Sequence, residues 1–341
     1  MDDCQVATVC HGARAVPVDG RIGEAPGSGM DQFGAVEVAD LAPVAAVLIS
    51  RILLIGVERV LLRRIGSVGG PTECAAVFFG VGALVLLPFA HLGQIQDWDF
   101  LRLAVPSGLI YAVAYWFYVS ALSGGEVAAV APLSAANAAF VVLLAFLMHG
   151  EPISPTKVGG AGLIAAGAAF LQRRAPAAGV PAPSIRRPRL AAASWQMLAY
   201  AGLSALTRML DKANASAARS APAGTYGLVV FSVVAAAEFT LVLVTGRLPR
   251  FLTLLGRQPI AALAAGTCNG ISFLLLLVAL TLMPVSVAEP ITSLSLLVTA
   301  ALAWLWLREP VGARWLPTVA IIVGTWLLVA DGVVVAPALA G

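Results

Sequence analysis

Charged residues are scarce in this chain. Only 11% of its 341 residues are charged and 60% are hydrophobic, which gives a mean hydropathy of +0.91. A soluble domain carries about 25% charged residues, so the composition excludes an ordinary soluble protein and predicts an all-α polytopic membrane protein. The net charge of +3 comes from basic residues in short connections. This distribution bears on membrane orientation and predicts no nucleic-acid partner.

Motifs for metal binding and catalysis are also absent. The four cysteines show no CxxC spacing and the three histidines are isolated, so neither a zinc site nor a disulfide framework is expected. The sequence contains no GxSxG, HExxH or P-loop pattern, which are signatures of hydrolases, metalloproteases and nucleotide-driven pumps. These absences predict a protein that is not an enzyme and that needs no metal or cofactor.

The first forty residues differ from the rest of the chain. They begin with two aspartates after Met1 and contain no basic region followed by a continuous apolar run, which a secretory signal would need. Residues 1–40 are therefore predicted to form a disordered polar tail. Met30 leads directly into the first apolar run, so Met1 and Met30 are both candidate translation starts.

From Leu41 onward the chain is a series of long apolar segments. Each is close to the roughly 20 residues that a helix needs to cross about 30 Å of hydrocarbon. The runs are continuous rather than alternating, which predicts transmembrane helices. Ten helices are expected, at residues 41–62, 71–92, 101–122, 127–148, 156–172, 190–210, 224–245, 259–282, 285–307 and 313–335.

A basic connection at residues 173–189 divides the ten segments into two halves, 41–172 and 190–335, and residues 336–341 form a short C-terminal tail. The halves match without gaps at an offset of 158 positions over three segments: Gly108 meets Gly266, Pro132 meets Pro290, and Glu151-Pro152 meets Glu309-Pro310. Prolines and acids are scarce here, so these matches indicate a duplication. Because five is odd, the two halves are predicted to be inverted repeats, an arrangement that supports alternating access.

Two stretches carry a family resemblance. The pattern ALSGGEVAAVAPLSAANAAFVVLLAFLMHGEP and the pattern ALTLMPVSVAEPITSLSLLVTAALAWLWLREP resemble the EamA repeat of the drug/metabolite transporter superfamily. The resemblance implies a ten-helix secondary transporter in the bacterial inner membrane, usually an exporter of amino acids, metabolites or toxic compounds. A flippase-like lipid handler or a lipid-modifying enzyme stays open as the alternative.

The repeated prolines and acids have structural interpretations. Glu151 and Glu309 each precede a proline, which disfavours helical dihedrals at the residue before it, so both pairs are predicted to terminate helices. A proton site is the alternative for the two acids. Pro132 and Pro290 fall inside apolar segments, where each removes a backbone hydrogen bond and favours a kink. Freed backbone groups at membrane depth need protein or a water-filled cavity, so these two segments are predicted to line a central cavity.

Ionisable residues inside the apolar segments are costly and therefore informative. Arg51 is a candidate for binding a substrate carboxylate, because its guanidinium offers a fork of donors. Glu58, Glu238 and Glu289 are candidates for a coupling proton. In the structural alternative, Arg51 permanently neutralises Glu58 or Glu238. Further candidates for the cavity are Tyr111, Tyr115, Asn137, Asn269 and Ser293.

Other ionisable residues are placed at the membrane surface. Arg59 and Arg208 are expected to extend toward the surface along their aliphatic stems, and Glu73 is expected at the interface. A count of Lys and Arg places seven on the side of the N-terminal tail and thirteen on the other. This count predicts external termini, whereas the family resemblance implies cytoplasmic ones, so the orientation stays open. The oligomeric state, a monomer included, stays open as well.

Overall fold

The computed structural model describes residues 38–66, 68–95, 98–124, 130–149, 154–173, 186–217, 221–307 and 315–338. All regular secondary structure in these ranges is helical, which confirms the all-α prediction there. Residues 1–37 of the predicted tail, most of the basic connection and both Glu-Pro pairs lie outside the described residues. Residues 38–40, which were also predicted as tail, belong to the first helix.

Each predicted apolar segment overlaps between one and three consecutive helices. The first half contains α1 (Val38–Gly66), α2 (Pro71–Leu86), the short 3-10 helices η2 (Leu87–Phe89) and η3 (Leu92–Gln94), α3 (Leu101–Gly124), η4 (Ala131–Ala135), α5 (Ala136–His149) and α6 (Pro155–Arg173). The second half contains α7 (Arg186–Ser216), α8 (Ala223–Val244), α9 (Leu248–Arg257), α10 (Pro259–Leu282), α11 (Val285–Thr292), α12 (Ser295–Leu307) and α13 (Trp315–Ala338).

Five helical segments of the described chain are long and apolar enough to cross a membrane. They are Pro71–Phe89, Leu101–Ser123, Ala223–Val244, Pro259–Leu282 and Val285–Trp306. Shorter apolar helices accompany them, so the protein is a multi-pass membrane protein, while the count of ten spans stays a prediction. The helix α9 is an addition to the predicted set: its 10 residues are too few to span a bilayer.

The segments that contain Pro132 and Pro290 are each divided into two helices. Pro132 lies in the 3-10 helix η4, which precedes α5. Pro290 lies in α11, which ends at Thr292, and α12 begins at Ser295. Between α11 and α12 the backbone bonds span three residues, as in Ser293 N–H to Pro290 O at 2.9 Å, which is the tighter 3-10 pattern. A proline lacks the N–H that would continue the α-helical ladder.

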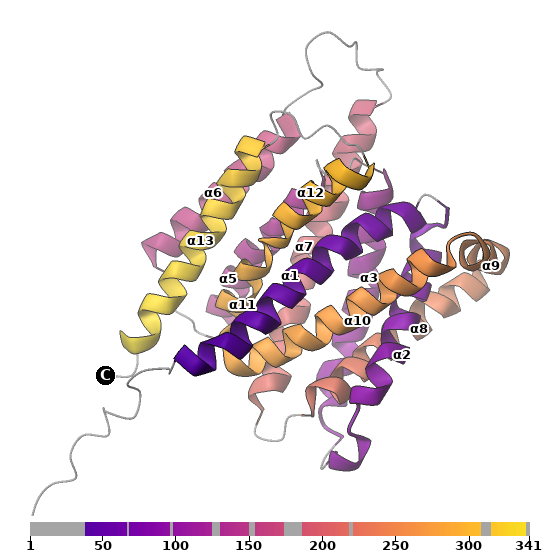
Figure 1. Ribbon diagram of the computed structural model, residues 1–341, viewed down its shortest axis with the longest axis horizontal. Helices are drawn as coiled ribbons and strands as arrows, with labels where there is room; N and C mark the ends of the chain where they lie inside the picture. Colours follow the sequence, from indigo (N-terminus) through magenta and orange to yellow (C-terminus); the bar gives the residue numbers. More distant parts are fainter. Residues whose placement is uncertain are drawn as a thin grey trace, which may run out of the picture. The chain divides into compact units, whose positions relative to one another are not determined.

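Helices from the two halves pack against each other throughout the described chain, which forms one unit from Val38 onward. Figure 1 shows α1 beside α10 and α6 beside α13, and both pairs are in contact. The other extensive contacts between the halves join α2 to α8, α3 to α7, α2 to α10, α3 to α8, α5 to α7 and α1 to α12. Every α-helix named above for the first half therefore touches the second half.

Two glycines allow close approach between helices at matching places. A Cβ on Gly108 of α3 would lie 2.8 Å from Val233 Cβ of α8, and a Cβ on Gly266 of α10 would lie 2.5 Å from Val81 Cβ of α2. Small residues of this kind let helix backbones pack closely in membranes. The glycines thus fix how α3 meets α8 and how α10 meets α2.

Candidate functional site

A polar cavity lies among helices of both halves. Its lining comes from α1, α3, η4 and α5 of the first half and from α7, α10, α11 and α12 of the second, with Ser293 between α11 and α12. The polar residues that line it are Arg51, Glu58, Arg59, Tyr115, Tyr118, Ser134, Asn137, Tyr200, Arg208, Asn269, Ser272, Glu289, Thr292 and Ser293. Most of these side chains are buried, so their polar groups must be satisfied by one another or by a ligand.

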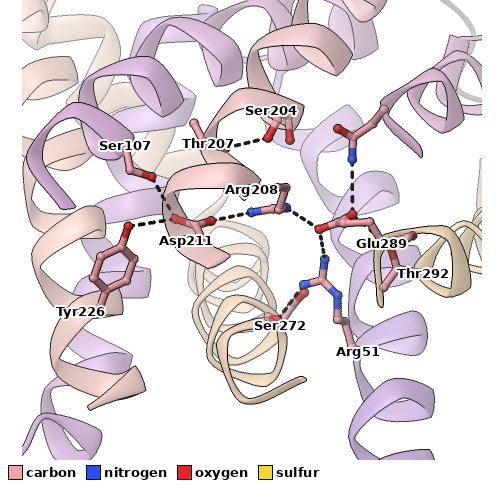
Figure 2. A network of polar contacts seen from close by, with 11 residues as sticks. Arg51, Ser107, Ser204, Thr207, Arg208, Asp211, Tyr226, Ser272, Glu289 and Thr292 are labelled. Carbon is pink, nitrogen blue, oxygen red and sulfur yellow. Dashed lines mark hydrogen bonds and ion pairs between the residues drawn. The ribbon is translucent and has the colours of Figure 1, made fainter. Parts of the chain in front are cut away.

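Glu289 is the meeting point of the cavity's polar contacts (Figure 2). Its Oε1 atom forms ion pairs with Arg51 Nη2, at 3.3 Å, and with Arg208 Nε. Its Oε2 atom accepts hydrogen bonds from Asn137 Nδ2 at 3.3 Å and from Thr292 Oγ1 at 3.4 Å. Arg51 and Asn137 belong to the first half of the chain and Arg208 to the second, so a single carboxylate connects the halves.

The network continues from Arg208 to Asp211. The Nη1 atom of Arg208 lies 3.1 Å from Asp211 Oδ2, and Asp211 Oδ1 accepts hydrogen bonds from Ser107 at 3.0 Å and Tyr226 at 3.1 Å. The guanidinium of Arg208 also lies 5.3 Å from the centre of the Tyr111 ring, within the range of a cation–π interaction. Arg208 is thus neutralised by two carboxylates, which makes its burial tolerable.

Arg59 has a different environment. Its guanidinium donates hydrogen bonds to Tyr118 Oη at 3.3 Å, Ser134 Oγ at 3.1 Å and Thr299 Oγ1 at 3.4 Å. Within the described residues it forms no ion pair with a carboxylate. Glu58 precedes it in the chain and lines the same cavity, yet it also has no ion pair in the described part of the chain.

Comparison with known proteins shows the fold and a similarity of part of the chain to a transporter family. Residues 40–173 match the model of the EamA-like transporter family, which is part of the drug/metabolite transporter superfamily. A solved structure titled "Crystal structure of protein" is 18% identical, with a TM-score of 0.60, and the match covers 85% of this chain and 97% of that one. At this identity the likeness shows the fold alone. No curated protein sequence matches the chain.

Seven of the nine cavity candidates line the cavity, and the EamA-like segment supplies four of them. The seven are Arg51, Glu58, Tyr115, Asn137, Asn269, Glu289 and Ser293. Tyr111 does not line the cavity but lies under Arg208. Glu238 of α8 is also absent from the lining, although its side chain is buried.

The partner of Arg51 differs from the predicted ones. The structural alternative paired Arg51 with Glu58 or Glu238, whereas the ion pair in the structure is with Glu289. Arg51 Nη1 also donates to Ser272 O at 2.9 Å. Two of its nitrogens are therefore occupied by protein, and the interpretation of Arg51 as the group that binds a substrate anion loses support.

Two surface predictions are wrong. Arg59 and Arg208 were expected at the membrane surface, but they are 8% and 5% exposed and line the cavity. Glu73 lies in the first turn of α2, at a helix start as predicted, and its place at the interface stays a prediction. Its side chain is 0% exposed, and neither of its carboxylate oxygens has a hydrogen-bond partner among the described residues. The place of Arg59 could have been predicted from its spacing. Positions i, i+7 and i+8 share one helix face, so Arg59 lies on the same face as Arg51 and Glu58.

Proposed function

We propose that this EamA-like protein is a secondary-active transporter that moves small molecules, as an exporter, across the bacterial inner membrane by alternating access. The observation that carries the proposal is the polar cavity to which both halves of the chain contribute and which Glu289 connects. A buried polar cavity between helices of two halves is the usual place of a transporter's substrate site.

The packing supports an inverted repeat. The proposed repeat pairs α1 with α7, α2 with α8, α3 with α10, α5 with α12 and α6 with α13. Under this pairing, the contact of α1 with α10 corresponds to that of α7 with α3, and the contact of α2 with α10 corresponds to that of α8 with α3. The contact of α5 with α7 becomes that of α12 with α1. The pairs α2 with α8 and α6 with α13 are exchanged into themselves. Each of these contacts has a counterpart, as a two-fold relation requires.

Individual residues follow the same exchange. Gly108 packs against Val230 and Val233 of α8, and Gly266 packs against Phe78 and Val81 of α2. The contacted residues are three positions apart in both helices. Such agreement between separate contacts supports duplication more strongly than matching apolar sequence does.

The contacts across the cavity are the ones that a change of access would alter. Glu289 binds Arg51 and Asn137 of the opposite half, and Arg59 binds Thr299 of the opposite half. The interruptions at Pro132 and Pro290 lie beside these contacts, where the helical ladder is already broken. Rocking of one repeat against the other around such interruptions would expose the cavity to either side in turn.

A proton is the proposed coupling ion. Glu58 lines the cavity, and Glu238 is buried in α8 outside the cavity lining, with its Oε2 lacking a hydrogen-bond partner in the described part of the chain. Neither has an ion pair with a described residue. A carboxyl without a cationic partner can gain or lose a proton without breaking an ion pair, which Glu289 cannot.

Transport by purified protein in lipid vesicles tests the proposal. A panel of water-soluble metabolites under an imposed pH gradient should contain at least one compound that the protein moves. Asn269→Ala should reduce this movement by about tenfold, the loss of one good polar contact. Its fold should be retained, because Asn269 Nδ2 has no hydrogen-bond partner among the described residues.

Thr281→Ala is the matched control, since Thr281 lies on the same helix, is exposed and donates only to its own helix at Val278 O. This variant should transport like the unaltered protein. Movement of labelled lipid between leaflets, without transport of any metabolite, would contradict the proposal and support the lipid handler.

A further inference from the structure

Arg59 is a buried cation of the cavity that forms no ion pair with a carboxylate of the described residues. We infer that Arg59 binds an oxyanion of the substrate, so that the transported compounds are organic anions carrying a carboxylate or a phosphate. This inference rests on the proposed function, since it assigns the substrate class of the same cavity. It replaces Arg51 by Arg59 as the anion-binding residue.

The hydroxyl groups around Arg59 orient it without cancelling its charge. Ser134 Oγ donates its own proton to Ala131 O at 2.7 Å, and Thr299 Oγ1 donates to Ser295 O at 2.8 Å. Each hydroxyl therefore presents a lone pair to the guanidinium. Because these acceptors are neutral, they hold the planar group in one orientation while its positive charge persists. More N–H donors exist on an arginine than these contacts use.

The other two arginines of the cavity are already satisfied by carboxylates. Arg51 is paired with Glu289, and Arg208 is paired with both Glu289 and Asp211. These four groups form a closed set of two cations and two anions. Arg59 has no ion pair with a carboxylate of the described residues, and a buried charge without a counter-charge is costly. An anionic ligand would remove that cost.

Glu58 does not take the place of the ligand. It lines the cavity but forms no ion pair with Arg59. An arginine keeps its charge at every physiological pH, whereas a carboxyl loses its charge when it binds a proton. Of the neighbours Glu58 and Arg59, only Arg59 is charged at every physiological pH. A ligand of the cavity that complements this permanent positive charge is an anion.

The surroundings of Arg59 suit an organic anion rather than a bare ion. The rings of Tyr118 and Tyr200 stack with centres 4.4 Å apart, and Tyr115 packs against both. All three tyrosines line the cavity with Arg59. They provide apolar ring surface for a carbon skeleton next to the guanidinium, and small-molecule sites commonly combine apolar walls with a few placed polar groups.

Ligand-dependent thermal stability of the purified full-length protein in detergent tests the inference. Each anion is compared with a neutral molecule of similar shape: benzoate with benzamide, and phenyl phosphate with phenol. At least one anion should raise the melting temperature, and its neutral counterpart should not. Which of the two anions acts will distinguish a carboxylate substrate from a phosphate ester.

Two variants assign the effect to Arg59. Arg59→Gln removes the charge and should weaken anion binding about tenfold or more, while Arg59→Lys keeps the charge without the fork and should bind the anion with intermediate strength. The control is Thr281→Ala, because Thr281 is exposed on α10 and donates to Val278 O of its own helix, and this variant should leave the anion effect unchanged.

The inference is overturned if no anion stabilises the unaltered protein, if the neutral molecules stabilise it equally, or if Arg59→Gln retains the full anion effect. None of these measurements depends on transport. Anion binding at Arg59 without any transport in vesicles would sink the proposed function alone. Transport of neutral metabolites with no anion effect would sink the anion assignment alone.

Discussion

Arg59 and Arg208 occupy corresponding places in the two halves but have opposite partners. Each lies four residues before a basic residue that binds carbonyls at the end of a neighbouring helix: Arg63 binds Leu122 O and Ser123 O near the end of α3, and Lys212 binds Leu280 O and Met283 O at the end of α10. Yet Arg59 is surrounded by hydroxyls, whereas Arg208 is surrounded by carboxylates.

This difference shows which features the two halves share and which they do not. The helix packing and the basic residues at the helix ends agree between the halves. The groups that face the cavity do not. The helix packing is therefore symmetric, but the cavity lining is not. In the second half, Arg208 is neutralised by carboxylates and joins the repeats, whereas in the first half the charge of Arg59 is open to a ligand.

The largest expected effect comes from removing the shared carboxylate. Glu289→Gln leaves Arg51 without an acidic partner and Arg208 with Asp211 alone, so the free energy of unfolding should fall by about 3–5 kcal/mol, as for other broken buried ion pairs. Thermal unfolding followed by tryptophan fluorescence measures this loss. Glu238→Gln is the control, because that carboxylate has no ion pair within the described residues. Equal losses in both variants would show that Glu289 has no special role.

An intermediate effect is expected from filling the glycine contacts. Gly108→Ala and Gly266→Ala each place a Cβ against a valine of the facing helix, and overpacking of this kind should cost about 1–3 kcal/mol in each case. Gly162→Ala on α6 is the control, since its Cβ would meet nothing within 4 Å. Similar losses for the first two variants would support the equivalence of the α3–α8 and α10–α2 contacts. A loss in only one of the two variants would contradict that equivalence.

Much of the helical architecture could be predicted from the sequence, because long apolar runs have few alternatives in a bilayer. The prolines at 132 and 290 indicated interruptions for a local reason, the missing N–H. The helix α9 could not be predicted in the same way. It is a short helix with Leu254 buried and Arg250 and Arg257 exposed, and its formation depends on packing against α2 and α8.

The site was predictable in part. Arg51, Glu58 and Glu289 stood out because charge inside an apolar run is costly wherever it lies. Their partners could not be predicted, since Arg51 and Glu289 are 238 positions apart and meet only through tertiary packing. Arg59 and Arg208 were wrongly predicted at the membrane surface because of their positions in the apolar runs. Each lies close to the end of an apolar run, and distance along the run does not reveal that α1 and α7 continue past it, to Gly66 and Ser216.

The smallest expected effect concerns the basic residues at the helix ends. Arg63→Met and Lys212→Met remove charged hydrogen bonds to terminal carbonyls of α3 and α10, and each should lower the free energy of unfolding by about 1 kcal/mol. Both side chains are partly exposed, so no buried charge is left behind, and Thr281→Ala is again the unchanged reference in thermal unfolding. If Arg63 and Lys212 make the same capping interaction in the two repeats, the two variants should lose similar amounts of unfolding free energy. If only Lys212→Met lowers stability, the two basic residues do not make equivalent contacts, and the correspondence of Arg59 with Arg208 then rests on helix packing alone.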